Sequence, residues 1–198
     1  MDYTGGQGKD THPKGCEIPQ SEETVFNGVL IHVNHMQVEL PNGHTAKREI
    51  VYHNGGAAIV PVDADENIYM VRQHRVAVDE MTLEIPAGKL EYRGADFRDA
   101  AIRELEEETG LRAENVELLT SAFPTPGYCN EILGIYMATG LSQHEDHPDP
   151  DEFLHVEKLP LKEALDRVMT GEFRDAKTII GILMTWYRLH GYEAPCKK

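Results

Sequence analysis

The sequence predicts an α+β fold, in which a mixed sheet is flanked by helices (an α/β/α sandwich) and preceded by an antiparallel β-subdomain. Three observations predict this fold. Residues 24–52 alternate apolar and polar side chains in short runs, which is typical of strands. The apolar run at residues 57–62 indicates a buried strand, and residues 68–73 are expected to form a second strand after a turn. Apolar residues at helical spacing occur in three later segments, residues 97–109, 161–170 and 178–190.

The N-terminal part divides into an arm and a small β-subdomain. Residues 1–20 are polar and rich in glycine and charge, and they predict a disordered arm or, alternatively, an arm that orders against a partner subunit. Residues 21–54 carry the short strands, with Pro41-Asn42-Gly43 as a hairpin turn. Residues 55–198 are then expected to form the main domain.

The main domain mixes strands and helices without an internal repeat. A strand at residues 82–86 leads into Ala87-Gly88, and the helix of residues 97–109 is followed by Gly110, a residue type favoured just past a helix end. We expect further strands at residues 116–121, 131–139 and 153–158.

The charge of the chain limits its partners. With 19 Lys and Arg against 34 Asp and Glu, the formal net charge is −15, which repels nucleic-acid backbones and anionic membranes. No apolar stretch approaches the roughly 20 residues that span a bilayer. An anionic phosphate substrate would also be repelled, so that such a substrate requires divalent cations between it and the protein.

The three cysteines indicate a reducing compartment. Cys16, Cys129 and Cys196 lie far apart and lack the spacing of metal ligands. The first twenty residues also lack the apolar region of a signal peptide. A cytoplasmic protein is therefore expected.

A cluster of glutamates marks the helix of residues 97–109. Glu104, Glu107 and Glu108 lie three and four positions apart, so they share one helix face, while Ala101 and Leu105 face the core. The simplest interpretation is a solvated acidic face. However, Arg103 is the only cation between residues 102 and 111, and clustered carboxylates suit Mg²⁺ or Mn²⁺. A metal site is therefore the favoured interpretation.

These residues resemble the signature of the Nudix hydrolases, which runs glycine, five residues, glutamate, seven residues, then Arg-Glu-apolar-any-Glu-Glu-any-Gly-apolar. The second half matches Arg103 to Leu111 without a mismatch. The first half departs from the pattern: Ala95 stands where the family has its first glutamate, and one extra residue separates that position from Gly88. Glu91 or Asp96 could take the place of that glutamate.

The resemblance implies roles for single residues. Glu104 and Glu108 would ligate the metal, Mg²⁺ or Mn²⁺, with Glu107 as a further or bridging ligand. The backbone carbonyl of Ala87 would complete one site, and Arg103 would orient the glutamates. The fold implied is a Nudix-type mixed sheet, and the activity implied is hydrolysis of a pyrophosphate bond.

Three longer segments are similar to the ADP-ribose pyrophosphatase branch of that family: residues 70–91, 124–141 and 171–187. Members of this branch cleave ADP-ribose to AMP and ribose 5-phosphate. They are commonly homodimers in which an N-terminal β-subdomain helps to cover the partner's substrate. The strands predicted in residues 24–52 match that layout.

Several residues near the signature are candidates for substrate contact. Arg72 and Arg75 suit a pyrophosphate, since a guanidinium can bind it with two hydrogen bonds; as alternatives, Arg72 is a surface charge and Arg75 pairs with Asp79 or Glu80. Gly88 would lie against the substrate. Glu131 is either a site residue or a charge at the start of a strand.

The resemblance to this branch implies that the general base comes from the acidic loop of residues 142–156. Glu152 best matches the acid-Glu-Phe pattern of the branch, with Asp151 and Glu145 as alternatives. The same loop could be a solvated lid. Two other functions stay open: hydrolysis of another nucleotide sugar, such as GDP-mannose or UDP-glucose, and a non-catalytic ADP-ribose sensor.

Overall fold

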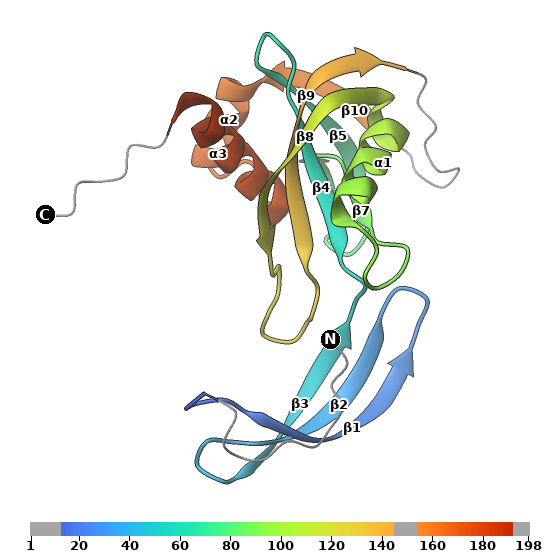
Figure 1. The fold of residues 1–198 in the computed structure, drawn as a ribbon, viewed down its shortest axis with the longest axis vertical. Coiled ribbons are helices and arrows are strands. Elements are labelled where there is room, and N and C mark those ends of the chain that lie inside the picture. Colours follow the sequence, from blue (N-terminus) through green and yellow to red (C-terminus); the bar gives the residue numbers. More distant parts are fainter. Residues whose placement is uncertain (1–12, 145–153, 192–198) are drawn as a thin grey trace, which may run out of the picture. The chain divides into compact units, whose positions relative to one another are not determined.

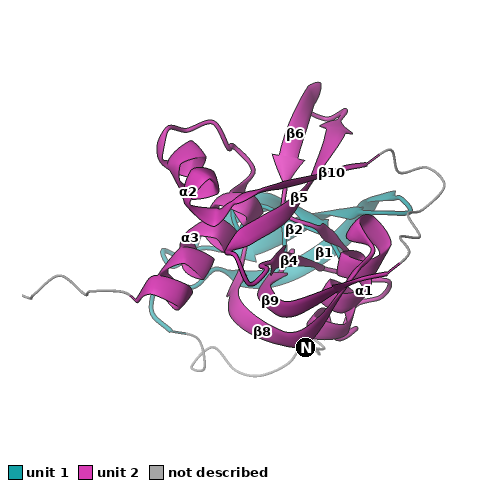
Figure 2. Cartoon of the chain, turned by 90° about the horizontal axis from the view of Figure 1, so that it is seen from above, with its two compact units in different colours: residues 1–53, 125–130 teal, residues 54–124, 131–198 magenta. Residues whose placement is uncertain are grey.

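The computed structural model describes residues 13–144 and 154–191. The chain divides into two units, which Figure 1 shows as ribbons and Figure 2 colours separately. The first unit holds the residues up to His53 together with Thr125–Asn130. The second unit holds Asn54–Pro124 and the chain from Glu131 onwards.

The first unit is a three-stranded antiparallel sheet. Its strands β1 (Ile18–Asn27), β2 (His32–Glu39) and β3 (Thr45–Tyr52) lie in chain order. The predicted hairpin turn between β2 and β3 is present, with Gly43 at a φ of 81°. The predicted end of the arm at residue 20 is wrong, because β1 already begins at Ile18.

The loop of residues 125–130 belongs to this sheet. The backbone N–H of Val51 donates to the carbonyl of Tyr128 (2.7 Å), and the N–H of Asn130 donates to the carbonyl of Val51 (3.1 Å). The loop is thus attached to the edge strand β3, although it follows β3 by more than seventy residues in the chain.

The second unit contains a four-stranded mixed sheet in the order β7-β4-β9-β8. Strand β4 (Gly56–Pro61) runs parallel to β9 (Leu133–Gln143) and antiparallel to β7 (Ala87–Lys89), and β8 (Leu111–Ala122) runs antiparallel to β9. The predicted mixed sheet is therefore confirmed.

A second, antiparallel sheet of the same unit has the order β10-β5-β6. Its strands are β10 (His155–Pro160), β5 (Asn67–Arg75) and β6 (Glu80–Glu84). Strand β6 was predicted at residues 82–86; it begins earlier because it pairs with β5 as far as Arg75, and it ends before Ile85.

Helix α1 (Phe97–Thr109) begins and ends where the sequence predicts. The carboxylate of Asp96 accepts hydrogen bonds from the N–H groups of Arg98 (2.8 Å) and Asp99 (3.0 Å), which satisfies the first turn. Gly110 ends the helix in the left-handed region at a φ of 66°.

Helices α2 (Leu161–Met169) and α3 (Ala176–His190) close the chain. Helix α3 begins two residues earlier than predicted because the carboxylate of Asp175 accepts a hydrogen bond from the N–H of Thr178 (3.0 Å) and so caps it. Among the described helices, none is long and apolar enough to cross a membrane.

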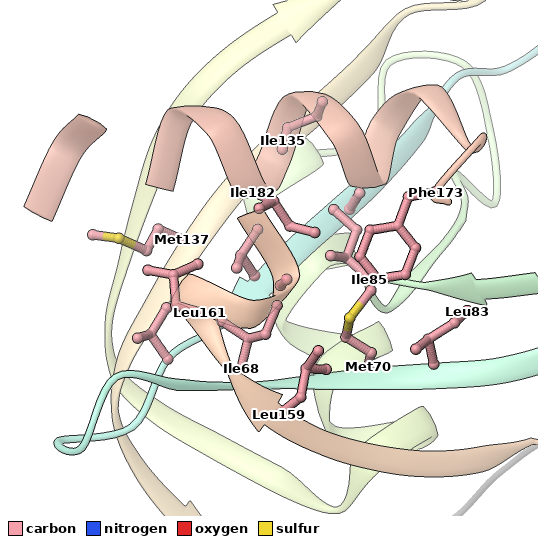
Figure 3. Packing of buried hydrophobic residues seen from close by; sticks show 14 of the residues in the cluster. Ile68, Met70, Leu83, Ile85, Ile135, Met137, Leu159, Leu161, Phe173 and Ile182 are labelled. Atoms are coloured by element: carbon pink, nitrogen blue, oxygen red, sulfur yellow. The ribbon is translucent and has the colours of Figure 1, made fainter. Parts of the chain in front are cut away.

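The core lies on both faces of β4, which is why this strand is apolar throughout. Ala57 and Ile59 point into a cluster under α1, whereas Ala58 and Val60 point into a larger cluster that includes residues of α2 and α3. Helix α1 covers one face of the four-stranded sheet and α3, with α2 beside it, covers the other (Figure 1). Figure 3 shows the larger cluster.

Candidate active site

The glutamates of α1 differ in burial as their helical spacing predicts. The side chains of Glu104 and Glu108 are buried, with 6% and 4% of each residue exposed, and Glu107 is half-buried. Leu105, on the opposite face, is fully buried in the core. Glu106 lies outside the trio and pairs with Arg112. A solvated acidic face would leave its carboxylates in water. Burying a carboxylate costs free energy unless it is paired or binds a metal, so the burial of Glu104 and Glu108 sets α1 apart from such a face.

Strand β7 lies against these carboxylates. The N–H of Ala87 donates to a carboxylate oxygen of Glu108 (3.1 Å). A Cβ added at Gly88 would overlap the carboxylate of Glu104. A side chain at residue 88 would therefore displace the carboxylate of Glu104, and β7 and α1 together form one wall of the site.

Arg103 joins two of the glutamates. Its Nη1 lies 2.7 Å from Glu107 Oε2, and its Nη2 lies 2.7 Å from Glu104 Oε1. Desolvation would lower the pKa of Arg103, but Glu104 and Glu107 outweigh it and raise that pKa. Arg103 thus forms an ion pair with each of these two glutamates.

These residues fit a divalent cation of the magnesium type. Two buried carboxylates and a third half-buried one share a helix face beside a glycine that leaves room for them. Within residues 13–144 and 154–191, no three carboxylate, imidazole or thiol groups are gathered as a ready-made metal site. Mg²⁺ fits such an open set, because it binds a few protein carboxylates and takes its other ligands from water and substrate phosphate.

The two candidates for the glutamate that the signature has at Ala95 lie in different surroundings. Asp96 is occupied as the cap of α1. Glu91, in contrast, lies close enough to Arg103 to contribute to its raised pKa. Of the two candidates for the missing glutamate, Glu91 is therefore the one whose charge acts on Arg103.

The two candidate arginines on β5 both pair with acids of the protein. Arg72 pairs with Glu157 of β10. Arg75 forms two bonds with Glu84, from Nε (2.8 Å) and Nη2 (2.7 Å), instead of the pairs with Asp79 or Glu80 considered from the sequence. The hydrogen bond to Glu84 chiefly raises the pKa of Arg75, and Glu108 adds to it, so Arg75 lies within the electrostatic field of the site.

Glu84 is the residue that sequence reasoning missed. Only 2% of it is exposed, and it receives bonds from Arg75, Thr82 (2.6 Å) and Lys177. Burial would raise the pKa of Glu84, but its bonds to Arg75 and Lys177 outweigh burial and lower that pKa to about 2. Its place in an otherwise apolar strand end, next to Leu83 and Ile85, is the signal that could have identified it.

Glu131 lies at the edge of the same unit, just before β9. Its carboxylate would be 3.7 Å from a Cβ added at Gly56, the first residue of β4, and Gly56 pairs across the sheet with Lys89 of β7. Glu131 is therefore close to the strand that carries Gly88. The base candidates Glu145, Asp151 and Glu152 lie outside the described residues.

Comparison with known proteins assigns a family to this geometry. The NUDIX domain family matches residues 52–179. A methanol dehydrogenase activator of Bacillus methanolicus is 43% identical over 162 residues, which is 81% of this chain and 87% of that protein. An ADP-ribose pyrophosphatase of Bacillus subtilis (strain 168) is 41% identical over 164 residues, which is 82% of this chain and 88% of that protein.

A solved structure supports the same architecture. The crystal structure of an ADP compounds hydrolase matches with a TM-score of 0.77, covering 91% of this chain and 99% of its own. At 23% sequence identity, this likeness shows the fold alone. The predicted fold class and the resemblance to the ADP-ribose pyrophosphatase branch are both confirmed by these comparisons.

Proposed function

This chain belongs to the Nudix hydrolase family, and from that membership we propose that it hydrolyses the pyrophosphate bond of ADP-ribose to AMP and ribose 5-phosphate. The observation that supports the proposal most is the contact of β7 with α1, where Ala87 and Gly88 meet Glu108 and Glu104. The ADP-ribose pyrophosphatase among its relatives supports the choice of substrate. The hydrolase domain would span residues 55–198, with residues 21–54 as a β-subdomain.

Mg²⁺, or Mn²⁺ in its place, is the cofactor that the donor set fits. Glu104, Glu107 and Glu108 would hold it with the carbonyl of Ala87. When bound, the metal would polarise a phosphoryl oxygen and lower the pKa of a bound water. Arg103 keeps Glu104 and Glu107 in place through its two ion pairs.

The substrate would be bound by groups on β5, β7 and the start of β9. A guanidinium can bind a pyrophosphate with two hydrogen bonds. Arg75 would use Nη1 and the second N–H of Nη2 for this, because Nε and the first N–H of Nη2 bind Glu84. Arg72, Gly88 and Glu131 complete the proposed contacts. Arg72 could bind the substrate only if its ion pair with Glu157 opens, or if its guanidinium contacts Glu157 and the substrate at the same time.

Glu152 is proposed as the general base that accepts a proton from the attacking water, with Asp151 and Glu145 as alternatives. The choice rests on the resemblance of this loop to the acid-Glu-Phe pattern of the branch. Glu152→Gln would lower kcat by about two to four powers of ten if Glu152 is the base. If the Glu152→Gln variant keeps its turnover, Asp151 or Glu145 is the general base instead.

The chain is proposed to act as a cytoplasmic homodimer. On β1 and the following turn, four large apolar residues are exposed in the single chain, Val25, Phe26, Val29 and Leu30. A second copy of the chain would cover them. Cys16 and Cys129 are free thiols, which suits a reducing compartment. Sedimentation velocity tests the dimer directly.

A panel of nucleotide sugars with Mg²⁺ tests the substrate. Released AMP, GMP or UMP would be measured with ADP-ribose, GDP-mannose and UDP-glucose, and ADP-ribose should give the highest kcat/KM. Equal rates on ADP-ribose and GDP-mannose would refute the substrate choice. Binding of ADP-ribose without any turnover would instead indicate a sensor. Nucleic acids and anionic vesicles should not bind, because the net charge is −15.

A second candidate function comes from the relative named a methanol dehydrogenase activator, which is 43% identical to this chain. In that role the chain would raise the rate of a methanol dehydrogenase when the two are mixed. The two functions are separated by adding the chain to such a dehydrogenase and following the rate of alcohol oxidation. An unchanged rate leaves the hydrolysis of ADP-ribose as the proposed function.

A further inference from the structure

The first turn of α3 contacts the segment of residues 84–88, which leads from β6 into β7. The hydroxyl oxygen of Thr178 accepts a hydrogen bond from the N–H of Ile85 (3.0 Å), and both residues are fully buried. The neighbouring Lys177 pairs with the carboxylate of Glu84. Two consecutive residues of α3 thus bind two consecutive residues of the 84–88 segment.

The same segment is held at each following residue by other elements. The carbonyl of Pro86 accepts a hydrogen bond from the N–H of Ile59 of β4 (2.9 Å). Ala87 donates to Glu108, and Gly88 lies against Glu104. Only Pro86 separates Ile85 from Ala87. The contact of α3 with Ile85 therefore also fixes the backbone positions of Ala87 and Gly88, which contact the glutamates.

The packing of α3 on Ile85 is tight. A Cβ added at Gly181, one turn beyond Thr178, would lie 2.9 Å from Ile85 Cδ1 and 2.9 Å from Val60 Cγ2, so α3 approaches the sheet as closely as its backbone permits. Figure 3 shows Ile85 in the core with Ile182 of α3 and with Phe173. Interiors packed this closely transmit small displacements rather than absorb them.

The start of helix α3 does not need the Thr178 hydroxyl. Asp175 caps it by accepting from the N–H of Thr178 (3.0 Å), and Asp175 also lies 3.0 Å from Lys177 Nζ. The Thr178 hydroxyl and the second contact of the Lys177 ammonium are thus directed at the 84–88 segment. Through Glu84, Lys177 also acts on Arg75.

We propose that Thr178 and Lys177 are positioning residues of the active site. Thr178 sets the backbone of the 84–88 segment so that Ala87 and Gly88 meet the glutamates of α1. Lys177 fixes the position of the Glu84 carboxylate, and Glu84 in turn fixes the orientation of the Arg75 guanidinium. This inference rests on the proposed function, since it names what orients that site.

The test uses a matched pair of variants. Thr178→Val keeps the shape of the side chain and removes the acceptor of the Ile85 N–H, whereas Thr178→Ser keeps the acceptor. Three quantities are measured on each full chain: kcat with ADP-ribose and Mg²⁺, Mn²⁺ affinity from the electron paramagnetic resonance signal of free Mn²⁺, and hydrogen exchange of the Ala87 amide.

Thr178→Val should lower kcat and Mn²⁺ affinity about tenfold or more, as loss of a supporting contact behind metal ligands does, and should speed the exchange of the Ala87 amide. Thr178→Ser should stay within about threefold of wild type in both measures. A Thr178→Val protein with a lower Tm but unchanged kcat, Mn²⁺ affinity and Ala87 exchange would overturn the role of Thr178 and leave it structural.

Lys177 gives a second, independent pair. Lys177→Met should raise KM about tenfold with a smaller change in kcat, and Lys177→Arg should restore most of the loss. In an Arg75→Ala background, Lys177→Met should have no further effect on KM, because its action passes through Arg75. An additive effect in that background would overturn the route. These variants also serve if Thr178→Val fails to fold.

Failure of the proposed function would look different. A wild-type chain that hydrolyses none of the nucleotide sugars refutes the function, while Mn²⁺ affinity and Ala87 exchange in the Thr178 pair still decide the positioning role. Active wild type with wild-type behaviour in all four variants refutes the positioning role alone.

Discussion

Gly88 of β7 lies so close to the carboxylate of Glu104 of α1 that a Cβ added at residue 88 would overlap this carboxylate. The two residues are sixteen positions apart in the sequence, and they meet because β7 pairs with β4 and α1 packs against both strands. Because of this contact, the position of the buried Glu104 carboxylate depends on the backbone of the short strand β7. Any atom added at residue 88 therefore acts on Glu104.

Gly88→Ala should lower kcat by about 100-fold, because the added methyl displaces Glu104, and misplacing a catalytic group by about 1 Å has an effect of that size. Mn²⁺ affinity should fall with it. Steady-state kinetics and the electron paramagnetic resonance signal of free Mn²⁺ would measure both. If far-UV circular dichroism is unchanged and kcat stays within threefold of wild type, Glu104 has no need of its present position.

Glu108→Gln should lower kcat by a few powers of ten, because it removes one negative charge from the proposed metal site. The amide oxygen of glutamine can still accept the hydrogen bond from the N–H of Ala87, so the fold should be kept. Glu106→Gln is the matched control: Glu106 is on the same helix but pairs with Arg112 outside the trio, and its kcat should be unchanged. Turnover by Glu108→Gln within tenfold of wild type would refute the metal assignment.

The sequence could predict most elements of the second unit because their patterns are local. Helix α1 was predicted with the bounds that the structure shows, since Gly110 marks its end and apolar residues recur at helical spacing before it. Strand β4 was recognised from its continuous apolar run. The start of β1 at Ile18 was missed because nine of its ten residues are exposed, so that no alternation of buried and exposed positions marks it.

The site was predictable in part for the same reason. Glu104, Glu107 and Glu108 lie on one helix, and their spacing alone puts them on one face. The partners that come from distant segments were not predictable. Lys177, which binds Glu84, follows it by more than ninety residues in the sequence. Arg75 pairs with Glu84 instead of Asp79 or Glu80. Side-chain direction in a hairpin depends on the packing of both faces, which spacing does not specify.

Arg103→Lys should lower kcat about tenfold to 100-fold while the charge is kept. The guanidinium contacts Glu104 and Glu107 through two different nitrogens at 2.7 Å each, and the single ammonium of lysine cannot hold both carboxylates in the same arrangement. The Mg²⁺ concentration for half-maximal rate should rise, and titrating Mg²⁺ at saturating ADP-ribose measures it. Equal Mg²⁺ dependence in the variant and the wild type would show that charge alone is sufficient.

Glu84 should make the stability of the protein depend on acidic pH. Its pKa is lowered from 4.5 to about 2 in the folded chain, which corresponds to stabilisation on the order of 3 kcal/mol. Because the folded pKa is the lower one, this stabilisation is complete above about pH 4.5 and is lost as the pH falls from there towards 2. Asp63, whose pKa is also lowered to about 2, adds to the same acid dependence.

Glu84→Gln separates the two contributions. At pH 7 the variant should be less stable than wild type by roughly 3 kcal/mol or more, since Arg75 and Lys177 are left without their buried counter-charge. The difference in the free energy of unfolding should shrink by about 2 kcal/mol at pH 3. At that pH the wild type has lost part of the stabilisation from ionised Glu84, which the variant lacks at every pH. Urea unfolding of both proteins at pH 7 and pH 3 measures the difference, and the contribution of Asp63 cancels in it. A difference that stays constant between the two pH values would mean that Glu84 has an ordinary pKa and that the Arg75–Glu84–Lys177 group is not the buried ion network described above.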